Sequence, residues 1–584
     1  MTKVDVLFGL KKEDNPLREK VCFYIINFLL FPNQTPYFFV DNHAHVLSLE
    51  SPNFGVNFAA VLSNQNRNGR YRTNGLCRSR TTPFYALNAG MKTYYDLIDQ
   101  TFEFPTREFN VENNELMFNN VPLMDIVKEY GTPLKLTYLP KITEHIEHAK
   151  LLFKNAMKRY NYKGNYTYCY CTKSSHFRFV LDEVLKNNVH LETSSAYDIQ
   201  ILRELYKSGK VNKSTYIICN GYKRPLYTQY ISELLNEGFT NCIPVLDNLK
   251  EIEAYENSVT TDTVNFGIRI ATDEEPNFAF YTSRLGIRYS DVNELYRTKI
   301  QPNEKFKLKM LHFFINTGIK DSAYYWSELS RFMYKYCELR KMCPDLDSID
   351  IGGGMPIQTS FQFTYDYQAM IDQIVESIQW ICNKNNVPVP HIFTEFGSYT
   401  VGESGAVIYK VIDQKLQNDK ELWYMIDGSF ITQLPDSWGL GQKYIMLSVN
   451  NWENPYQKVN LGGLTCDSHD FYNTEAHSAD LYLPIFDQDT EDQYIGLFHT
   501  GAYQESLGGY GGIQHCLIPA PQHVIVDKDE EGNLRTRLFA PEQNSEVMLK
   551  ILGYGNAEPG MTELEATEAA EEREEEAELV KEEN

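Results

Sequence analysis

The sequence predicts an α/β protein whose main domain is a (β/α)8 barrel and whose second domain is mostly β. The first observation is an alternation of short β-rich runs with amphipathic helical stretches, which begins near residue 142. The second is size, because eight such units in roughly 250 residues match this barrel. The third is a change after residue 410 to short strands and turns rich in Tyr, Gly and Pro. An open doubly wound sheet is the alternative arrangement of the same units.

The expected elements follow from the spacing of apolar residues. Helical spacing is clearest in Lys141–Tyr160, where Ile142, Ile146, Ala149 and Phe153 fall on one face. The expected helices cover residues 141–160, 177–187, 197–208, 226–237, 325–343 and 367–385. The expected strands cover residues 166–172, 190–193, 215–219, 242–246, 264–270, 308–315, 348–351 and 392–395.

Composition divides the chain into five segments. We expect a basic N-terminal extension over 1–90, with Met91 as an alternative start, and a lead-in over 91–140 that contributes to the β domain. The barrel, which binds the cofactor deduced below, spans 141–410, and the C-terminal β domain spans 411–555. Residues 556–584 are rich in Glu and Ala, which predicts an acidic tail that is disordered or helical.

Charge and cysteine content exclude several classes of protein. The 584 residues carry a formal net charge of -23, which disfavours a broad nucleic-acid surface. The apolar run Val21–Phe31 is about half as long as a membrane-spanning helix needs to be, and no signal-cleavage site follows it. Eleven cysteines, an odd number, favour a reducing compartment. We therefore expect a cytoplasmic protein that binds neither nucleic acid nor membrane.

Polar residues follow the strand candidates at their carboxyl ends, where barrel enzymes carry their chemistry. Because these ends meet at one rim, the residues should converge there. In chain order they are Lys173, Glu192, Asn220, Asp247, Arg269, Thr317, the triplet Gly352 to Gly354, and Glu395.

Three of these features have a chemical meaning when they are taken together. Lys173 shares the phase of Cys169 and Cys171, so it faces the barrel interior, where desolvation lowers an amine's pKa and leaves it nucleophilic. Gly352 to Gly354 can expose backbone N–H groups to a phosphate, and Glu395 can keep a pyridine nitrogen protonated. Taken singly, they are also compatible with a surface lysine, a loop and a salt-bridged acid. Together they match pyridoxal 5'-phosphate, whose protonated ring favours carbanion reactions such as decarboxylation.

Eight motifs occur in an order that resembles one known family. They are Tyr170 to Ser174, Glu192 to Ser195, Ile218 to Lys223, Arg269 to Asp273, Asp350 to Gly354, Glu395 to Gly397, Thr465 to Ser468 and Gly501 to Tyr503. The chain resembles the ornithine, diaminopimelate and arginine decarboxylases, which are pyridoxal-phosphate enzymes of fold type III with an alanine-racemase-like barrel. The resemblance covers about Met91 to Tyr554 and is strongest to the bacterial arginine decarboxylase branch, which begins polyamine and spermidine biosynthesis.

The resemblance implies a role for each matching residue. Lys173, Cys466 and Glu395 would be catalytic: the covalent anchor of the cofactor, the proton donor after carbon dioxide leaves, and the partner of the ring nitrogen. Cys466 comes from the neighbouring subunit in this family, so a homodimer with shared active sites is implied. Asp436 and Asp467 would receive the distal cation of a small basic amino acid, and no metal is implied. The implied cofactor-binding residues are Lys173, Glu192, Arg269, Phe314, Thr317, Gly352, Gly353, Gly354, Glu395, Gly397, Ser398 and Tyr503.

Three features depart from the family pattern. Phe314 occupies the place of a histidine that stacks on the cofactor ring, and Ser398 occupies the place of an arginine that reaches the phosphate. The acids Glu192 and Asp198 have their side-chain lengths exchanged relative to the usual order. We therefore expect the phosphate to depend on backbone amides, Thr317, Ser398 and Tyr503.

Other functions remain open from the residues alone. Ornithine or diaminopimelate is an alternative substrate, and a catalytically inactive decarboxylase-like partner is an alternative of another class. Racemisation is disfavoured because Glu395 predicts a strong electron sink. A metal site is a further alternative, either at His43 and His45 or at Cys466, His469 and His477, because imidazole and thiolate ligands suit zinc.

Overall fold

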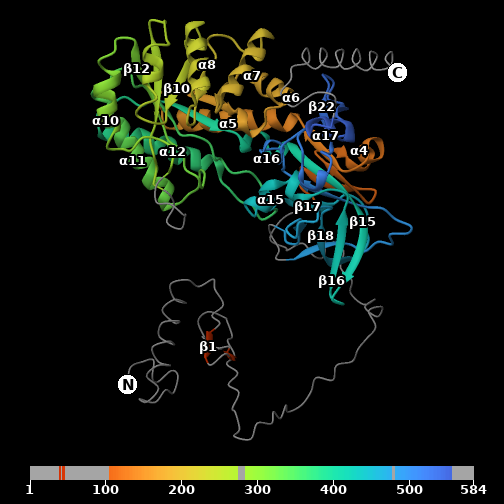
Figure 1. Ribbon diagram of the computed structural model, residues 1–584. Helices are drawn as coiled ribbons and strands as arrows, with labels where there is room; N and C mark the ends of the chain where they lie inside the picture. Colours follow the sequence, from red (N-terminus) through yellow and green to blue (C-terminus); the bar gives the residue numbers. More distant parts are fainter. Residues whose placement is uncertain (1–37, 41–42, 46–103, 274–282, 476–479, 555–584) are drawn as a thin grey trace, which may run out of the picture. The chain divides into compact units, whose positions relative to one another are not determined.

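A computed structural model describes residues 38–40, 43–45, 104–273, 283–475 and 480–554, and it gives only the backbone of 38–40 and 43–45 (Figure 1). The chain forms two compact units, 1–86 and 87–584. In the first unit, β1 (Phe38–Val40) pairs antiparallel with β2 (His43–His45). His43 and His45 therefore lie in a strand, and because their side chains are outside the described residues, the metal site proposed for them stays a prediction. The other expectations for 1–90 and those for 556–584 fall outside the described residues.

The second unit contains the predicted barrel. Eight parallel strands close in the order β10-β11-β12-β13-β14-β7-β8-β9, which confirms the fold class. The sixth strand ends at His312 instead of Ile315, because a turn closed by the Gly318 N–H and the Ile315 carbonyl follows it. The strands are β7 (Tyr166–Cys171), β8 (His190–Thr193), β9 (Ile217–Cys219), β10 (Cys242–Leu246), β11 (Val264–Arg269), β12 (Phe306–His312), β13 (Ser348–Asp350) and β14 (His391–Phe396).

Helices cover the outside of the barrel, and each predicted helix is present with ends within three residues of the expected ones (Figure 1). Their buried faces pack on the outer strand residues in one large hydrophobic cluster. The helices are α5 (Pro140–Arg159), α6 (Arg178–Leu185), α7 (Ala196–Lys207), α8 (Pro225–Asn236), α9 (Glu253–Glu256), α10 (Val292–Leu295), η2 (Tyr296–Ile300), α11 (Ala323–Arg340) and α12 (Tyr367–Lys384).

A small apolar cluster fills the inside of the barrel and forms the floor below the strand ends. It consists of Cys169, Ile218, Ile243, Val245, Met310 and Phe393. Strand residues alternate between the two faces of a sheet, so Cys171 follows Cys169 on the inner face. The Lys173 amine lies 2.7 Å from the Cys171 sulfur, which confirms the phase predicted for this lysine.

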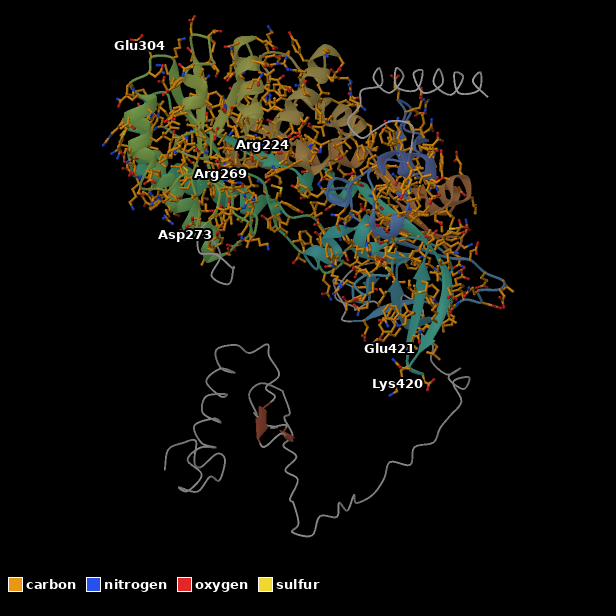
Figure 2. All side chains as sticks on the ribbon, in the orientation of Figure 1. Arg224, Arg269, Asp273, Glu304, Lys420 and Glu421 are labelled. Carbon is orange, nitrogen blue, oxygen red and sulfur yellow. The ribbon has the colours of Figure 1, made fainter. Side chains whose placement is uncertain are left out.

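The second domain is built on a ten-stranded sheet that includes a strand from before the barrel. β6 (Leu134–Tyr138) lies between β15 and β22, antiparallel to the first and parallel to the second. Lys420 and Glu421 mark the tip of the long β15–β16 hairpin (Figure 2). The other strands are β15 (Gly405–Gln417), β16 (Glu421–Ile426), β17 (Ile445–Ser448), β18 (Tyr456–Gly462), β19 (Phe471–Tyr472), β20 (Leu481–Pro484), β21 (Gln493–Phe498), β22 (Gln522–Lys528) and β23 (Leu534–Ala540).

Short elements complete this domain and link it to the barrel. The lead-in adds a three-stranded sheet and a helix: β3 (Phe109–Glu112), β4 (Glu115–Phe118), β5 (Val121–Pro122) and α4 (Leu123–Tyr130). The remaining helices are η1 (Thr172–Ser174), α13 (Ser398–Val401), η3 (Gly402–Ser404), α14 (Phe430–Gln433), α15 (Pro435–Gly439), α16 (Gln504–Gly508), η4 (His515–Leu517) and α17 (Ser545–Ile551). Among the described helices, none has both the length and the apolar composition that crossing a bilayer requires.

Four buried titratable groups and the half-buried Lys141 join the barrel to the β domain. Glu403 in η3 lies 3.0 Å from His145 and 3.5 Å from Lys141, both on α5. Lys141 also lies 3.5 Å from Glu108 of the lead-in, which lies 3.1 Å from His499 after β21. Burial alone would raise the pKa of Glu403, but the hydrogen bond to His145 and the charges of His499, His145 and Lys141 lower it well below its usual value.

We predict that Glu403→Gln lowers the free energy of unfolding by about 3 kcal/mol at pH 7, because it leaves buried cationic groups without their carboxylate. Because the pKa of this carboxyl group is lower in the folded than in the unfolded chain, the group stabilises the fold at pH values above its unfolded pKa. This stabilisation is lost as the pH falls toward the folded pKa. The difference from the wild type should therefore shrink below about pH 4. Denaturant unfolding measured across pH provides the test. The control is Glu144→Gln on α5, which changes an exposed acid and should shift stability by less than about 0.5 kcal/mol. An equal loss in both variants would contradict the prediction.

Candidate active site

The residues at the carboxyl ends of the barrel strands converge around Lys173. Lys173 lies in η1, directly after β7, and its amine donates a 2.9 Å hydrogen bond to Glu192 of β8. The Lys173 side chain is 42% exposed, whereas that of Glu192 is fully buried. Asn220, after β9, donates to Glu192 at 3.2 Å and to Glu395 of β14 at 2.6 Å. One amide thus holds the two carboxylates in place beside the amine.

The charge state of Lys173 differs from the one expected from the sequence. Burial lowers the pKa of this amine, but Cys171, Glu192 and Glu395 act in the opposite direction and raise it well above its usual value. Burial also raises the pKa of Cys171, so that thiol is neutral near pH 7 and the carboxylates account for the effect. The expected lowering of the Lys173 pKa by desolvation is therefore wrong for the protein without a ligand, because two acids lie beside the amine.

Glu395 is a buried carboxylate with a polar partner on each oxygen. Asn220 donates to one oxygen, and His312 Nε2 lies 3.3 Å from the other. Burial alone would raise the pKa of Glu395, but the charge and hydrogen bond of His312 and the Lys173 ammonium lower it below its usual value. Burial and the adjacent Glu395 raise the pKa of Asp350 well above its usual value. At neutral pH Glu395 is therefore the ionised acid of this pair, and Asp350 is protonated.

Sequence reasoning gave no role to His312 or Asp350. Both face the barrel interior at the ends of β12 and β13, where they lie level with each other in register. Asp350 also accepts a 2.8 Å hydrogen bond from the Gly352 N–H and so anchors the start of the glycine triplet. The period-two alternation of both strands, continued back from Phe314 and Gly352, would have placed them beside Glu395.

The glycine triplet packs against the backbone of two neighbouring segments. A Cβ atom on Gly353 would lie 2.4 Å from the Glu395 carbonyl oxygen. Gly354 and Gly318 face each other so closely that a Cβ on Gly354 would lie 2.6 Å from the Gly318 Cα. The Ile319 N–H donates to the Gly354 carbonyl at 2.8 Å and fixes this pairing. Thr317, immediately before Gly318, is half-buried at the same place. Only glycine at these positions allows this backbone cradle to form.

A second close approach brings Gly397, directly after β14, against Ser174, the residue after Lys173. A Cβ on Gly397 would lie 2.0 Å from the Ser174 hydroxyl oxygen, and Ser398 follows as the first residue of α13. On the other side, the Tyr503 N–H donates to the Ser174 carbonyl at 2.8 Å. Tyr503 has a left-handed backbone, with φ of 69°, at the start of α16. Ser174 is therefore held between the barrel and the β domain, next to Lys173.

Arg269 and Phe314 lie close together at the barrel mouth. Arg269 ends β11 and is labelled among the barrel strands in Figure 2. Its guanidinium carbon lies 5.9 Å from the centroid of the Phe314 ring, which is 37% exposed. Burial lowers the pKa of Arg269, although Asp247, Glu395 and Glu192 favour its charge. This arginine supplies a cation beside the acids and the aromatic face.

Three predicted acids lie outside this contact network. Asp436 is buried in α15 and accepts a 2.7 Å hydrogen bond from Gln504, the residue after Tyr503. Asp198 caps α7 through the Ser194 and Ser195 N–H groups and lies 2.9 Å from His176. Asp467 receives hydrogen bonds from the backbone N–H and the ring of His469. Asp436 is thus connected through Gln504 to Tyr503, one of the predicted site residues. Asp198 instead caps a helix.

Cys466 does not join the lysine group within one chain. Its sulfur is exposed and lies 3.3 Å from the sulfur of Cys516. No hydrogen bond connects Cys466 or Asp467 with Lys173 or Glu395 in the described part of the chain. The alternative cluster of Cys466, His469 and His477 is not supported, because His515 and Cys516 are the residues grouped with Cys466, and His477 lies outside the described residues.

Comparisons with known proteins agree with this barrel. Residues 143–402 match the family model described as pyridoxal-dependent decarboxylase, pyridoxal binding domain. A biosynthetic arginine decarboxylase of Prochlorococcus marinus is 22% identical over 568 residues, which is 75% of this chain and 86% of that protein. The crystal structure of the biosynthetic arginine decarboxylase of Campylobacter jejuni superposes with a TM-score of 0.66 at 19% identity and covers 80% of this chain and 94% of that one. A diaminopimelate decarboxylase of M. jannaschii has a TM-score of 0.63 at 16% identity over 76% of this chain and 97% of its own.

We predict that Gly353→Ala weakens binding of pyridoxal phosphate by about tenfold or more, because relieving a forced contact in packed surroundings costs about 1–3 kcal/mol. Absorbance titration of the cofactor-free protein measures the affinity. The matched control is Gly439→Ala, since a Cβ there meets no atom within 4 Å. Unchanged affinity in Gly353→Ala would show that the cradle does not contribute to binding.

Proposed function

Since residues 143–402 form a pyridoxal-binding domain of the pyridoxal-dependent decarboxylase family, we propose that this protein converts L-arginine to agmatine and carbon dioxide. The observation that carries the proposal is the group of Lys173, Glu192, Asn220 and Glu395 at the ends of four barrel strands. The arginine decarboxylases among the relatives and solved structures favour arginine over other basic amino acids. This reaction would supply agmatine for polyamine and spermidine synthesis.

The residues present fit pyridoxal phosphate. The side chain of Lys173 is partly exposed, so its amine can be attached covalently once it gives up a proton, and Glu395 is ionised in a buried position that suits a protonated ring nitrogen. In the glycine cradle, the N–H groups of Gly318 and Gly352 already donate to Ile315 and Asp350. Within the described part of the chain, the N–H groups of Gly353 and Gly354 are therefore the ones left for a phosphate, without a Cβ in the way. When bound, the cofactor supplies an electron sink that stabilises the carbanion left by the departing carbon dioxide.

The chain's own residues prepare this chemistry through charge. His312 and Asn220 hold Glu395 as an anion, so it can retain a proton on its partner nitrogen. Glu192 keeps the Lys173 amine oriented before the cofactor attaches. Arg269 balances the acids, and Phe314 offers an aromatic face beside it. Phosphate binding would depend on the glycine cradle, Thr317, Ser398 and Tyr503 instead of an arginine.

The distal guanidinium of the substrate needs carboxylates, and Asp436 and Asp467 are the candidates. A guanidinium forms two parallel hydrogen bonds with a carboxylate, which a shorter ammonium substrate does not. Asp436 is buried and already oriented by Gln504. In the single chain the proposed proton donor Cys466 is exposed and Asp467 is half-buried. Their position supports a homodimer in which both residues enter the partner's site. We also propose a cytoplasmic location.

The direct experiment measures carbon dioxide release from arginine, ornithine, lysine and diaminopimelate by the purified full chain with pyridoxal phosphate. We expect the highest kcat/KM for arginine. Preference for ornithine or diaminopimelate would replace the substrate but keep the reaction. No release from any of the four would favour the alternative, a catalytically inactive decarboxylase-like partner.

Mixing two inactive variants tests the shared homodimer. Lys173→Ala should abolish covalent attachment of the cofactor after borohydride reduction, and Cys466→Ala should impair product formation more than cofactor binding. If each site combines Lys173 of one chain with Cys466 of the other, a mixture of the two variants should recover activity that neither has alone. Absence of recovery, with subunit exchange verified by mass, would contradict the shared site.

A further inference from the structure

Two exposed thiols approach each other at the edge of the β domain. Cys466 and Cys516 are 50 positions apart in the sequence, yet their sulfur atoms are 3.3 Å apart. The Cys466 N–H also points to the Cys516 sulfur at 3.5 Å. The other seven cysteines in the described ranges are buried, so this pair is distinct in its access to solvent.

His515 adds a ring nitrogen to the same cluster. One nitrogen of His515 and the two sulfurs all lie within 4.8 Å of one another. Successive residues of an extended segment point to opposite sides, but here the backbone is left-handed at Cys516 and Leu517, with φ of 56° and 54°. Such conformations cost free energy in residues other than glycine and gather at functional sites. The turn brings consecutive ligand atoms of His515 and Cys516 to one point.

We propose that Cys466, His515 and Cys516 bind a thiophilic divalent cation of the zinc type. Two sulfurs and an imidazole are its preferred ligands. Zinc–sulfur bonds of about 2.3 Å at a tetrahedral angle separate two sulfurs by about 3.8 Å. The observed separation of 3.3 Å is closer to this value than to the 2.05 Å or so of a disulfide. Three protein ligands leave the fourth position of the metal open to water.

Binding exchanges protons for the metal. A thiol binds zinc as a thiolate, so each sulfur gives up its proton when the metal binds. The cation forms one bond to each sulfur and one to the imidazole nitrogen, and the two thiol protons pass to solvent. No oxidation or reduction is involved. Chelation therefore reverses the reaction completely.

The consequence for activity rests on the function proposed above. Cys466 is the proposed proton donor, and a sulfur held in a metal bond has no proton to give. Occupation of the site would therefore inhibit decarboxylation reversibly. In this chain Cys516 and His515 would make the reaction sensitive to the concentration of free zinc.

The first experiment measures metal binding without any substrate. The reduced full chain, loaded with pyridoxal phosphate, is titrated with Co²⁺ as a spectroscopic substitute for zinc. We expect one equivalent per chain, with thiolate-to-cobalt charge-transfer absorption that Zn²⁺ abolishes by displacement. Cys516→Ser and His515→Ala should each weaken Co²⁺ binding by about 100-fold or more, since even loss of an outer partner costs about 10- to 100-fold.

A neighbouring histidine provides the matched control. His469 is exposed and follows Cys466 by three residues, but its ring lies against Asp467 outside the cluster. His469→Ala should therefore retain the affinity and the absorption of the wild type. Equal loss in His469→Ala and His515→Ala would overturn the proposed ligand set.

Three results would overturn the site itself. The first is the absence of thiolate absorption from the reduced protein, and the second is unchanged binding in Cys516→Ser. The third is loss of both free thiols to an internal disulfide on purification, with no metal bound after reduction. The site and the enzyme activity fail separately, because Co²⁺ binding is read without turnover. If the chain proves active, zinc should lower its rate in the wild type more than in Cys516→Ser, each relative to its own metal-free rate.

Discussion

The charge on Glu395 is the constraint around which the barrel mouth is arranged. Placing an ionised carboxylate among buried residues costs several kcal/mol unless hydrogen bonds and opposite charges offset it. Here Asn220 and His312 supply the hydrogen bonds, Lys173 supplies the charge, and Asp350 remains neutral. These four residues come from four different strand ends, so only a closed barrel brings them to one acid. The fold and the ionisation state of the site depend on each other.

The sequence was sufficient to predict the architecture because the alternation is a local property. Apolar spacing gave all eight barrel strands and six helices, since each helix must bury one face against the strands beside it. The place where a strand stops is not local. β12 ends at His312 because a turn at Gly318 packs against Gly354, which comes from another part of the chain. The residue pattern within β12 does not predict that contact.

The sequence predicted which residues form the site better than it predicted their charge states. Lys173, Glu192, Asn220 and Glu395 could be found because each closes a strand and all strands end at one rim. The raised pKa of Lys173 could not be predicted, because it follows from distances of about 3 Å between residues far apart in the chain. The alternation in β12 places His312 on the inner face, but it does not show that His312 lies 3.3 Å from Glu395. The same holds for Cys516, whose nearness to Cys466 depends on a left-handed turn.

Strand β6 has a consequence for the synthesis of this chain. It is made before the barrel, yet both of its neighbours in the sheet, β15 and β22, are made after it. The barrel is therefore an insertion within the second domain, and it can fold on the ribosome while β6 is still unpaired. The β domain must wait for the final strands to emerge. A ribosome that stops early would release a barrel attached to an open sheet edge, which is a substrate for aggregation and for quality control.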